Sequence, residues 1–208
     1  MLFTPDICYI CGEKLNDIIN KDHVPPKLFY PPQLRKTKAY NQLDKIQVHQ
    51  GCNTAYREDE EYFVHTFAPF LNTTRTGKLL RQHIATTFQK GRNVNLGQMI
   101  SNEFAFTYGS LQLPSGKMIN HFNINRISRV LDKISRGLHY IDNKSFLKHD
   151  LTYHVLAIKQ FSDVQPQLFN YFDKSKNIGK YPDIMDYSNI KIDNNCLVWL
   201  FIFWDYVI

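Results

Sequence analysis

The sequence has few cysteines and no apolar run long enough to cross a membrane. Its longest apolar run, residues 196–204, is far shorter than a bilayer span and predicts a buried strand. The first residues show neither the basic nor the apolar stretch of a secretory signal, so we expect a cytoplasmic protein in a reducing compartment. The sequence contains no internal repeat, low-complexity tract or long linker. These absences point to an ordinary globular protein.

The composition supports a folded domain with a basic surface. Hydrophobic residues make up 43% of the 208 positions and charged residues 21%, which argues against disorder. Fifteen phenylalanines and twelve tyrosines supply bulky side chains for a core. The formal net charge is +6 and the calculated isoelectric point is about 9.0, which favours a polyanionic partner.

The chain divides into two parts of different texture, residues 1–63 and residues 64–208. The first part holds three of the four cysteines and two proline-rich segments. This is typical of a small loop-rich module that needs a cross-link, such as a structural metal ion, to be stable. Apolar spacing predicts helices over 58–71, 76–89 and 124–138, two short strands within 104–122 around a turn at 113–116, and strands over 151–158 and 196–207. The fold class expected is therefore α+β. The second part shows no chemical motif, and we interpret it as a region for substrate positioning, oligomerisation or docking of a partner protein. The apolar strand at its end is expected to be internal or to pair with a partner.

Three of the four cysteines cluster with a histidine in the spacing of a zinc site. Cys8 and Cys11 form one x2 pair, His49 and Cys52 form a second, and only Cys196 is distant. Two thiolates on one tight turn can bind the same ion, and a second x2 pair completes the tetrahedron that Zn²⁺ takes in structural sites. The alternatives are a redox pair or chance neighbours beside a surface histidine. We predict a structural zinc ion on these four residues.

Two further polar segments flank this predicted zinc site. Asp22 and His23 lie between the two half-sites, and Asn53 follows Cys52 directly. Hydrolysis of a phosphodiester needs a base for the attacking water, which a histidine can supply. It also needs positive charge near the phosphate, and a Mg²⁺ or Mn²⁺ ion held by carboxylate and amide oxygens can provide it. Adjacent residues of a strand point to opposite faces, although a strand end near Pro25 would let one site use both. The alternative is that Asp22 and His23 are neighbouring loop residues with no catalytic role.

This layout resembles the HNH endonuclease superfamily. It is closest in arrangement to the zinc-bearing phage Holliday-junction resolvases of the endonuclease VII type. The stretch DHVPPKLF, followed by CN and DEEYF, is similar to a bacterial branch of HNH proteins. The resemblance covers residues 8–63, and His49 stands where the family more often has a third cysteine. Asn41 is the nearest match to the family's middle asparagine, with a structural role only.

The resemblance implies a ββα-metal finger in the first part of the chain. By position, His23 would be the general base, and Asp22 and Asn53 would hold a catalytic Mg²⁺ or Mn²⁺ ion. The implied activity is hydrolysis of phosphodiester bonds in DNA, in phage defence or restriction. The rival hypothesis is a zinc-ribbon-like module that binds nucleic acid or protein without catalysis and needs zinc only. An activating protein partner and a homo-oligomer are both compatible with the sequence.

Basic residues near the predicted site are candidates for contacts with nucleic acid. The candidates are Lys27, Arg35, Lys36, Lys38 and Arg57. A second basic set lies on the expected 124–138 helix, opposite its apolar stripe, and consists of Arg126, Arg129, Lys133 and Arg136. For this second set we favour a solvated helix face over a nucleic-acid contact, because any surface helix carries such a face.

Overall fold

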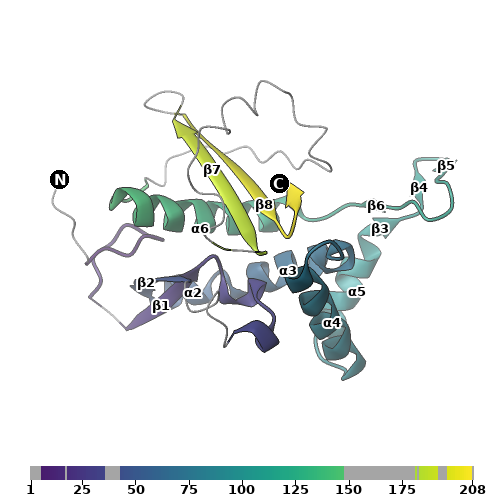
Figure 1. Cartoon of the computed structure of the whole chain (residues 1–208), viewed down its shortest axis with the longest axis horizontal. Coiled ribbons are helices and arrows are strands. Elements are labelled where there is room, and N and C mark those ends of the chain that lie inside the picture. Colours follow the sequence, from purple (N-terminus) through teal and green to yellow (C-terminus); the bar gives the residue numbers. More distant parts are fainter. Residues whose placement is uncertain are drawn as a thin grey trace.

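The protein combines helices with small antiparallel sheets, as expected of an α+β fold (Figure 1). This computed structural model describes residues 6–16, 18–35, 43–147, 181, 183–191 and 196–207. Among the helices of those residues, none is long and apolar enough to cross a membrane. One hydrophobic cluster contains buried residues from both sides of position 63, from Cys8 to Trp204.

A strand hairpin followed by helices forms the N-terminal part. Strand β1 (Ile19–Val24) pairs antiparallel with β2 (Asp44–His49), with Asp22 opposite Ile46 and His23 opposite Lys45. Helices α2 (Gln50–Thr54) and α3 (Arg57–Phe67) follow at once. The proline-rich segments after β1 form two short 3-10 turns, η1 (Lys27–Phe29) and η2 (Pro32–Leu34). The predicted 58–71 helix is confirmed as far as Phe67, and the 3-10 turn η3 (Ala68–Phe70) then takes over.

Two helices and two tiny strand pairs follow. Helix α4 (Arg75–Gln89) confirms the predicted 76–89 helix, and α5 (Val94–Asn102) was not predicted because only Ile100 of its residues is buried. Strand β3 (Phe104–Ala105) pairs with β6 (Ile119–Asn120), and β4 (Thr107–Tyr108) pairs with β5 (Leu111–Gln112). The expected turn is present between β3 and β6, where the Lys117 N–H donates to the Pro114 carbonyl at 3.0 Å, and the inner hairpin β4–β5 turns at Gly109, where φ is +60°. This hairpin projects from the rest of the protein (Figure 1).

Helix α6 (Ile124–Asn143) is the longest helix in the described residues and longer than the predicted 124–138. Asn123 caps its first turn by accepting from the backbone N–H groups of Asn125 and Arg126. All five predicted apolar positions are buried, namely Ile127, Val130, Leu131, Ile134 and Leu138.

The expectation of a solvated basic face on α6 is wrong for Lys133 and Arg136, whereas Arg129 is exposed. Lys133 is 1% exposed and Arg136 is 3% exposed. The physical reason is that α6 packs against α3 and β1, whose acidic side chains neutralise cations that would otherwise need water. Arg136 pairs instead with Asp132 on its own helix.

A three-stranded antiparallel sheet ends the chain. It contains β7 (Met185–Lys191), β8 (Leu197–Phe203) and β9 (Tyr206–Val207) in that order, so the predicted apolar strand β8 is internal. Trp204 and Asp205, both with positive φ, form the turn that divides the predicted 196–207 strand. The rings of Phe203 and Trp204 pack on Phe29 and Phe63 of the N-terminal part. The predicted strand 151–158 lies outside the described residues.

Candidate functional site

The four predicted zinc ligands lie together. One ligand atom from each of Cys8, Cys11, His49 and Cys52 lies within 4.8 Å of all the others. His49 Nδ1 is 3.3 Å from Cys11 Sγ and 3.9 Å from Cys52 Sγ. Three sulfurs and one imidazole nitrogen are a donor set that structural zinc sites use. The cluster could hold a metal ion and is consistent with structural zinc.

Local backbone geometry brings these ligands together. The backbone N–H of Gly12 donates to the Cys8 carbonyl at 2.8 Å, and Gly12 takes a φ of +78°, which closes the turn that carries both thiols. His49 ends β2 and precedes α2, and Cys52 lies in the first turn of that helix. His49 Nε2 lies 3.1 Å from the Lys14 carbonyl. A carbonyl can only accept, so Nε2 carries the proton and Nδ1 keeps its lone pair for a metal ion.

The Cys11 and Cys52 thiols are poorly ionised when no cation is bound. Burial raises the pKa of Cys11, and burial together with the neighbouring Cys11 and Cys8 raises the pKa of Cys52 to about 12. A bound zinc ion would reverse this shift, because it stabilises thiolates directly. Metal binding at this cluster would therefore release protons.

The two predicted oxygen ligands, Asp22 and Asn53, both contact one cation, which is the ammonium group of Lys133. The Lys133 ammonium lies 3.0 Å from the Asp22 carboxylate and 3.2 Å from Asn53 Oδ1. It also lies 2.5 Å from Glu60 Oε1 on α3. We call Asp22, Asn53, Glu60 and Lys133 the oxygen–lysine cluster. Its oxygens come from β1, α2 and α3, and its cation comes from α6.

Hydrogen bonds and charges around Asp22 affect the pKa values of its partners Tyr9 and Lys133. Asp22 accepts hydrogen bonds from the hydroxyl of buried Tyr9 and, at 2.9 Å, from the backbone N–H of His23. Burial, followed by the nearby Asp22 charge, raises the pKa of Tyr9 well above its ordinary value, so Tyr9 remains a donor. Burial opposes the charge on Lys133, but Asp22 and Glu60 outweigh it and raise the pKa of Lys133.

His23 lies on the other face of β1 from Asp22. Asp22 is buried, His23 is half-buried, and strand alternation directs the two side chains to opposite faces. Burial lowers the pKa of His23, and the positive charges of Lys45, Lys27 and Lys133 lower it further. The imidazole is therefore neutral near pH 7, which is the form that a general base requires.

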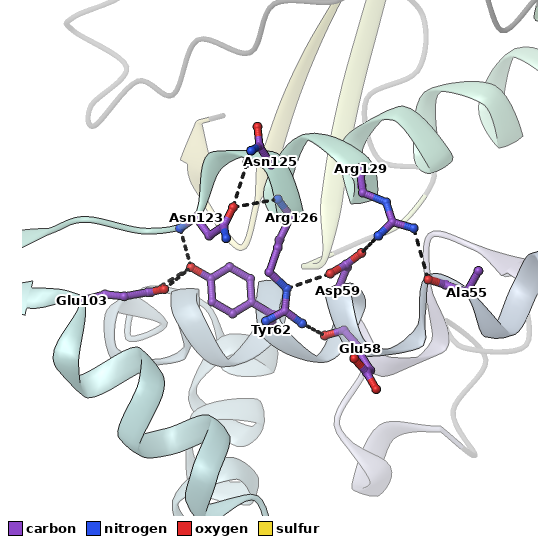
Figure 2. A network of polar contacts seen from close by, with 9 residues as sticks. All are labelled: Ala55, Glu58, Asp59, Tyr62, Glu103, Asn123, Asn125, Arg126 and Arg129. Atoms are coloured by element: carbon purple, nitrogen blue, oxygen red, sulfur yellow. Dashed lines mark hydrogen bonds and ion pairs between the residues drawn. The ribbon is translucent and has the colours of Figure 1, made fainter.

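A polar network holds α6 against α3 and so places Lys133 (Figure 2). Asp59 binds Arg126 Nε at 2.7 Å and Arg129 at 2.6 Å, and Arg126 also donates to the Glu58 carbonyl at 2.7 Å. At the start of α6 the Tyr62 hydroxyl accepts from the Asn123 backbone N–H at 2.6 Å and donates to Glu103. Asp59 and Glu60 are adjacent in α3, so the contacts that anchor α6 also bring Lys133 to Glu60.

Three of the predicted contacts with nucleic acid lie within the described residues. Lys27 in η1 and Arg57 at the start of α3 are exposed. Arg35 is half-buried, and its Nε donates to the Tyr30 carbonyl at 3.2 Å. Lys36, Lys38 and Asn41 lie outside the described residues.

Three residues of the site were not predicted. Glu60 lies in the predicted 58–71 helix, and its place in the DEEYF stretch is the one signal that could have identified it. Tyr9 and Lys133 show no sequence signal, because Lys133 lies 111 residues from Asp22.

The comparisons with known proteins give no family assignment. No protein-family model matches the chain, and neither the curated proteins nor the solved structures contain a significant match. The geometry of the site therefore carries the functional argument.

Proposed function

We propose that the chain is an endonuclease of the HNH kind that hydrolyses phosphodiester bonds in DNA. The observation that supports this most directly is the convergence of Asp22 and Asn53 on one cation, with His23 following Asp22 directly in β1. The oxygens of Asp22 in β1 and Asn53 in α2 share a cation, and these are the two positions at which the resemblance expects metal ligands. The hairpin β1–β2 followed by α2 and α3 gives the element order of a ββα finger.

His23 is the general base in this proposal. Its neutral imidazole takes a proton from a water molecule, and the water oxygen forms a bond to phosphorus. The bond to the leaving oxygen breaks, and that oxygen takes a proton from solvent. Exposed Lys27 and Lys45 attract the phosphate electrostatically to the face of β1 that carries His23.

The site has oxygen donors that suit the expected catalytic Mg²⁺ or Mn²⁺ ion, but the position between those donors is not free. A carboxylate and an amide oxygen suit either ion. In this structure the Lys133 ammonium lies between those oxygens, so the site does not fit a divalent ion unless Lys133 leaves. No step of the proposed reaction therefore passes through such an ion.

Cleavage of supercoiled plasmid and of single-stranded DNA tests the proposal. The zinc-loaded wild type should cleave, and His23→Ala with equal zinc content should lose the activity. His121→Ala is the matched control, because His121 is exposed and lies outside the site. Equal cleavage by wild type and His23→Ala would remove His23 from the mechanism, and no cleavage by the wild type on any substrate would reject the nuclease.

The second candidate is a zinc-stapled module that binds nucleic acid or protein without catalysis. The neutralised oxygen–lysine cluster favours it, because a closed cluster needs no further cation. In that case wild type and His23→Ala would bind DNA equally and neither would cleave it. Reversing Lys27 and Arg57 to Glu should then weaken DNA binding and flatten its salt dependence.

A further inference from the structure

The Lys133 ammonium fills the hydrogen-bonding capacity of the oxygen–lysine cluster. An ammonium group has three donors and no acceptor. Its three partners are oxygens of Asp22, Asn53 and Glu60, at 3.0, 3.2 and 2.5 Å. No donor of Lys133 is left for a phosphate, so this lysine does not act as a substrate-binding residue in the arrangement seen here. Its contacts neutralise and order the acidic cluster.

A divalent ion and the ammonium compete for the same oxygens. Mg²⁺ needs oxygen ligands at about 2.1 Å, so an ion bound to Asp22 and Asn53 would lie where the ammonium now lies. A divalent ion and the Lys133 ammonium so close together would repel each other strongly in a buried site. Lys133 is 1% exposed, so its charged end has no adjacent water to retreat into.

The fold also keeps the lysine from withdrawing. The pairing of Asp59 with Arg126 and Arg129 anchors α6 on α3, two turns and one turn before Lys133. One turn after Lys133, Gly137 packs directly on Val24 of β1. The ring of Tyr56 lies 5.5 Å from the ammonium and closes a further side. The backbone on both sides of Lys133 is therefore held.

We propose that Lys133 is the resident cation of the oxygen–lysine cluster, and that it excludes Mg²⁺ and Mn²⁺ from Asp22, Asn53 and Glu60. Lys133 is then a positioning residue that orders Asp22 behind His23. One consequence rests on the proposed nuclease function: DNA cleavage requires the structural zinc ion but no added divalent ion. The exclusion of the ion itself does not depend on any activity.

Binding of Mn²⁺ to the zinc-loaded full chain, followed by electron paramagnetic resonance, tests the exclusion. The wild type should leave added Mn²⁺ free in solution. Lys133→Met removes the ammonium and keeps most of the side-chain volume, so this variant should bind one Mn²⁺ ion per chain. The double variant Lys133→Met, Asp22→Asn should lose that site again. Thermal unfolding gives a second signal, because Mn²⁺ should raise the melting temperature of Lys133→Met and leave the wild type unchanged.

The wild-type measurement decides the proposal even if Lys133→Met does not fold. One Mn²⁺ ion bound per wild-type chain, and lost in Asp22→Asn, would overturn it and show that a divalent ion displaces Lys133. If the wild type binds no Mn²⁺ and also fails to cleave DNA, the nuclease fails while the exclusion stands. If it binds no Mn²⁺ and cleaves in a weak chelator that spares the zinc, both stand.

Discussion

Gly137 of α6 faces Val24 of β1 with no room for a methyl group between them. A Cβ atom on Gly137 would lie 2.6 Å from Val24 Cγ2 and 3.4 Å from a ring carbon of Tyr9. Val24 is buried, and its β-branched side chain has few rotamers with which to yield. This close approach of helix and strand places Lys133, one turn earlier, against Asp22.

Gly137→Ala should destabilise the protein. Overpacking costs about 1–3 kcal/mol, and the better helix propensity of alanine returns at most about 1 kcal/mol. Gly51→Ala is the matched control, because Gly51 is also helical and a Cβ there meets nothing within 4 Å. Denaturant unfolding of both variants measures the difference, and a Gly137→Ala protein as stable as wild type would contradict the tight packing.

Removal of zinc should unfold the N-terminal part. The wild type should contain about one zinc ion per chain, and structural zinc in small modules contributes about 10–16 kcal/mol at neutral pH. A strong chelator should therefore lower the melting temperature sharply, and Cys8→Ser should lose the metal. Cys196→Ser, at an exposed cysteine outside the cluster, should keep both metal and stability. Metal analysis and calorimetry check this, and full stability in chelator without zinc would rule the site out.

Asp59→Asn should weaken the contact between α3 and α6. The change removes a buried carboxylate from two arginines and should cost about 1.5–3 kcal/mol, the range for hydrogen bonds to charged groups. Glu58→Gln, at the exposed neighbouring position, should stay within about 0.5 kcal/mol of wild type. Urea unfolding of the two variants compares them directly. Equal effects would mean that the network in Figure 2 does not anchor α6.

His23 should titrate below its ordinary pKa of 6.5 in the folded protein. Burial and then Lys45 lower its pKa, so Lys45→Gln should move it upward. Because the unfolded chain binds this proton more readily, the contribution of His23 to stability is retained above pH 6.5 and lost as pH falls toward the folded pKa. NMR titration of the His23 ring in both proteins measures the shift. A normal pKa, or no response to Lys45→Gln, would refute the electrostatic account.

Short-range patterns determined a large part of this fold. The apolar stripe of residues 127–138 required an amphipathic helix, and the spacing of residues 76–89 did the same for α4. The two x2 pairs predicted the grouping of Cys8, Cys11, His49 and Cys52, because a turn and a helix start hold each pair by local geometry. Helix α5 was missed because a single buried residue leaves no period to detect.

The sequence by itself determined which groups could carry chemistry, and only the tertiary structure decided which charges meet. Asp22, His23 and Asn53 were candidates because each adjoins a predicted zinc half-site or lies between the two. Lys133 looked like one cation of a solvated helix face, since spacing along a helix says nothing about what packs against it. The folded chain brings it to Asp22 across 111 residues, and the loss of water around the ammonium then favours its pairing with the oxygens of Asp22, Asn53 and Glu60. Long-range packing of α6 against β1 and α3 therefore determines that the cation beside Asp22 is Lys133.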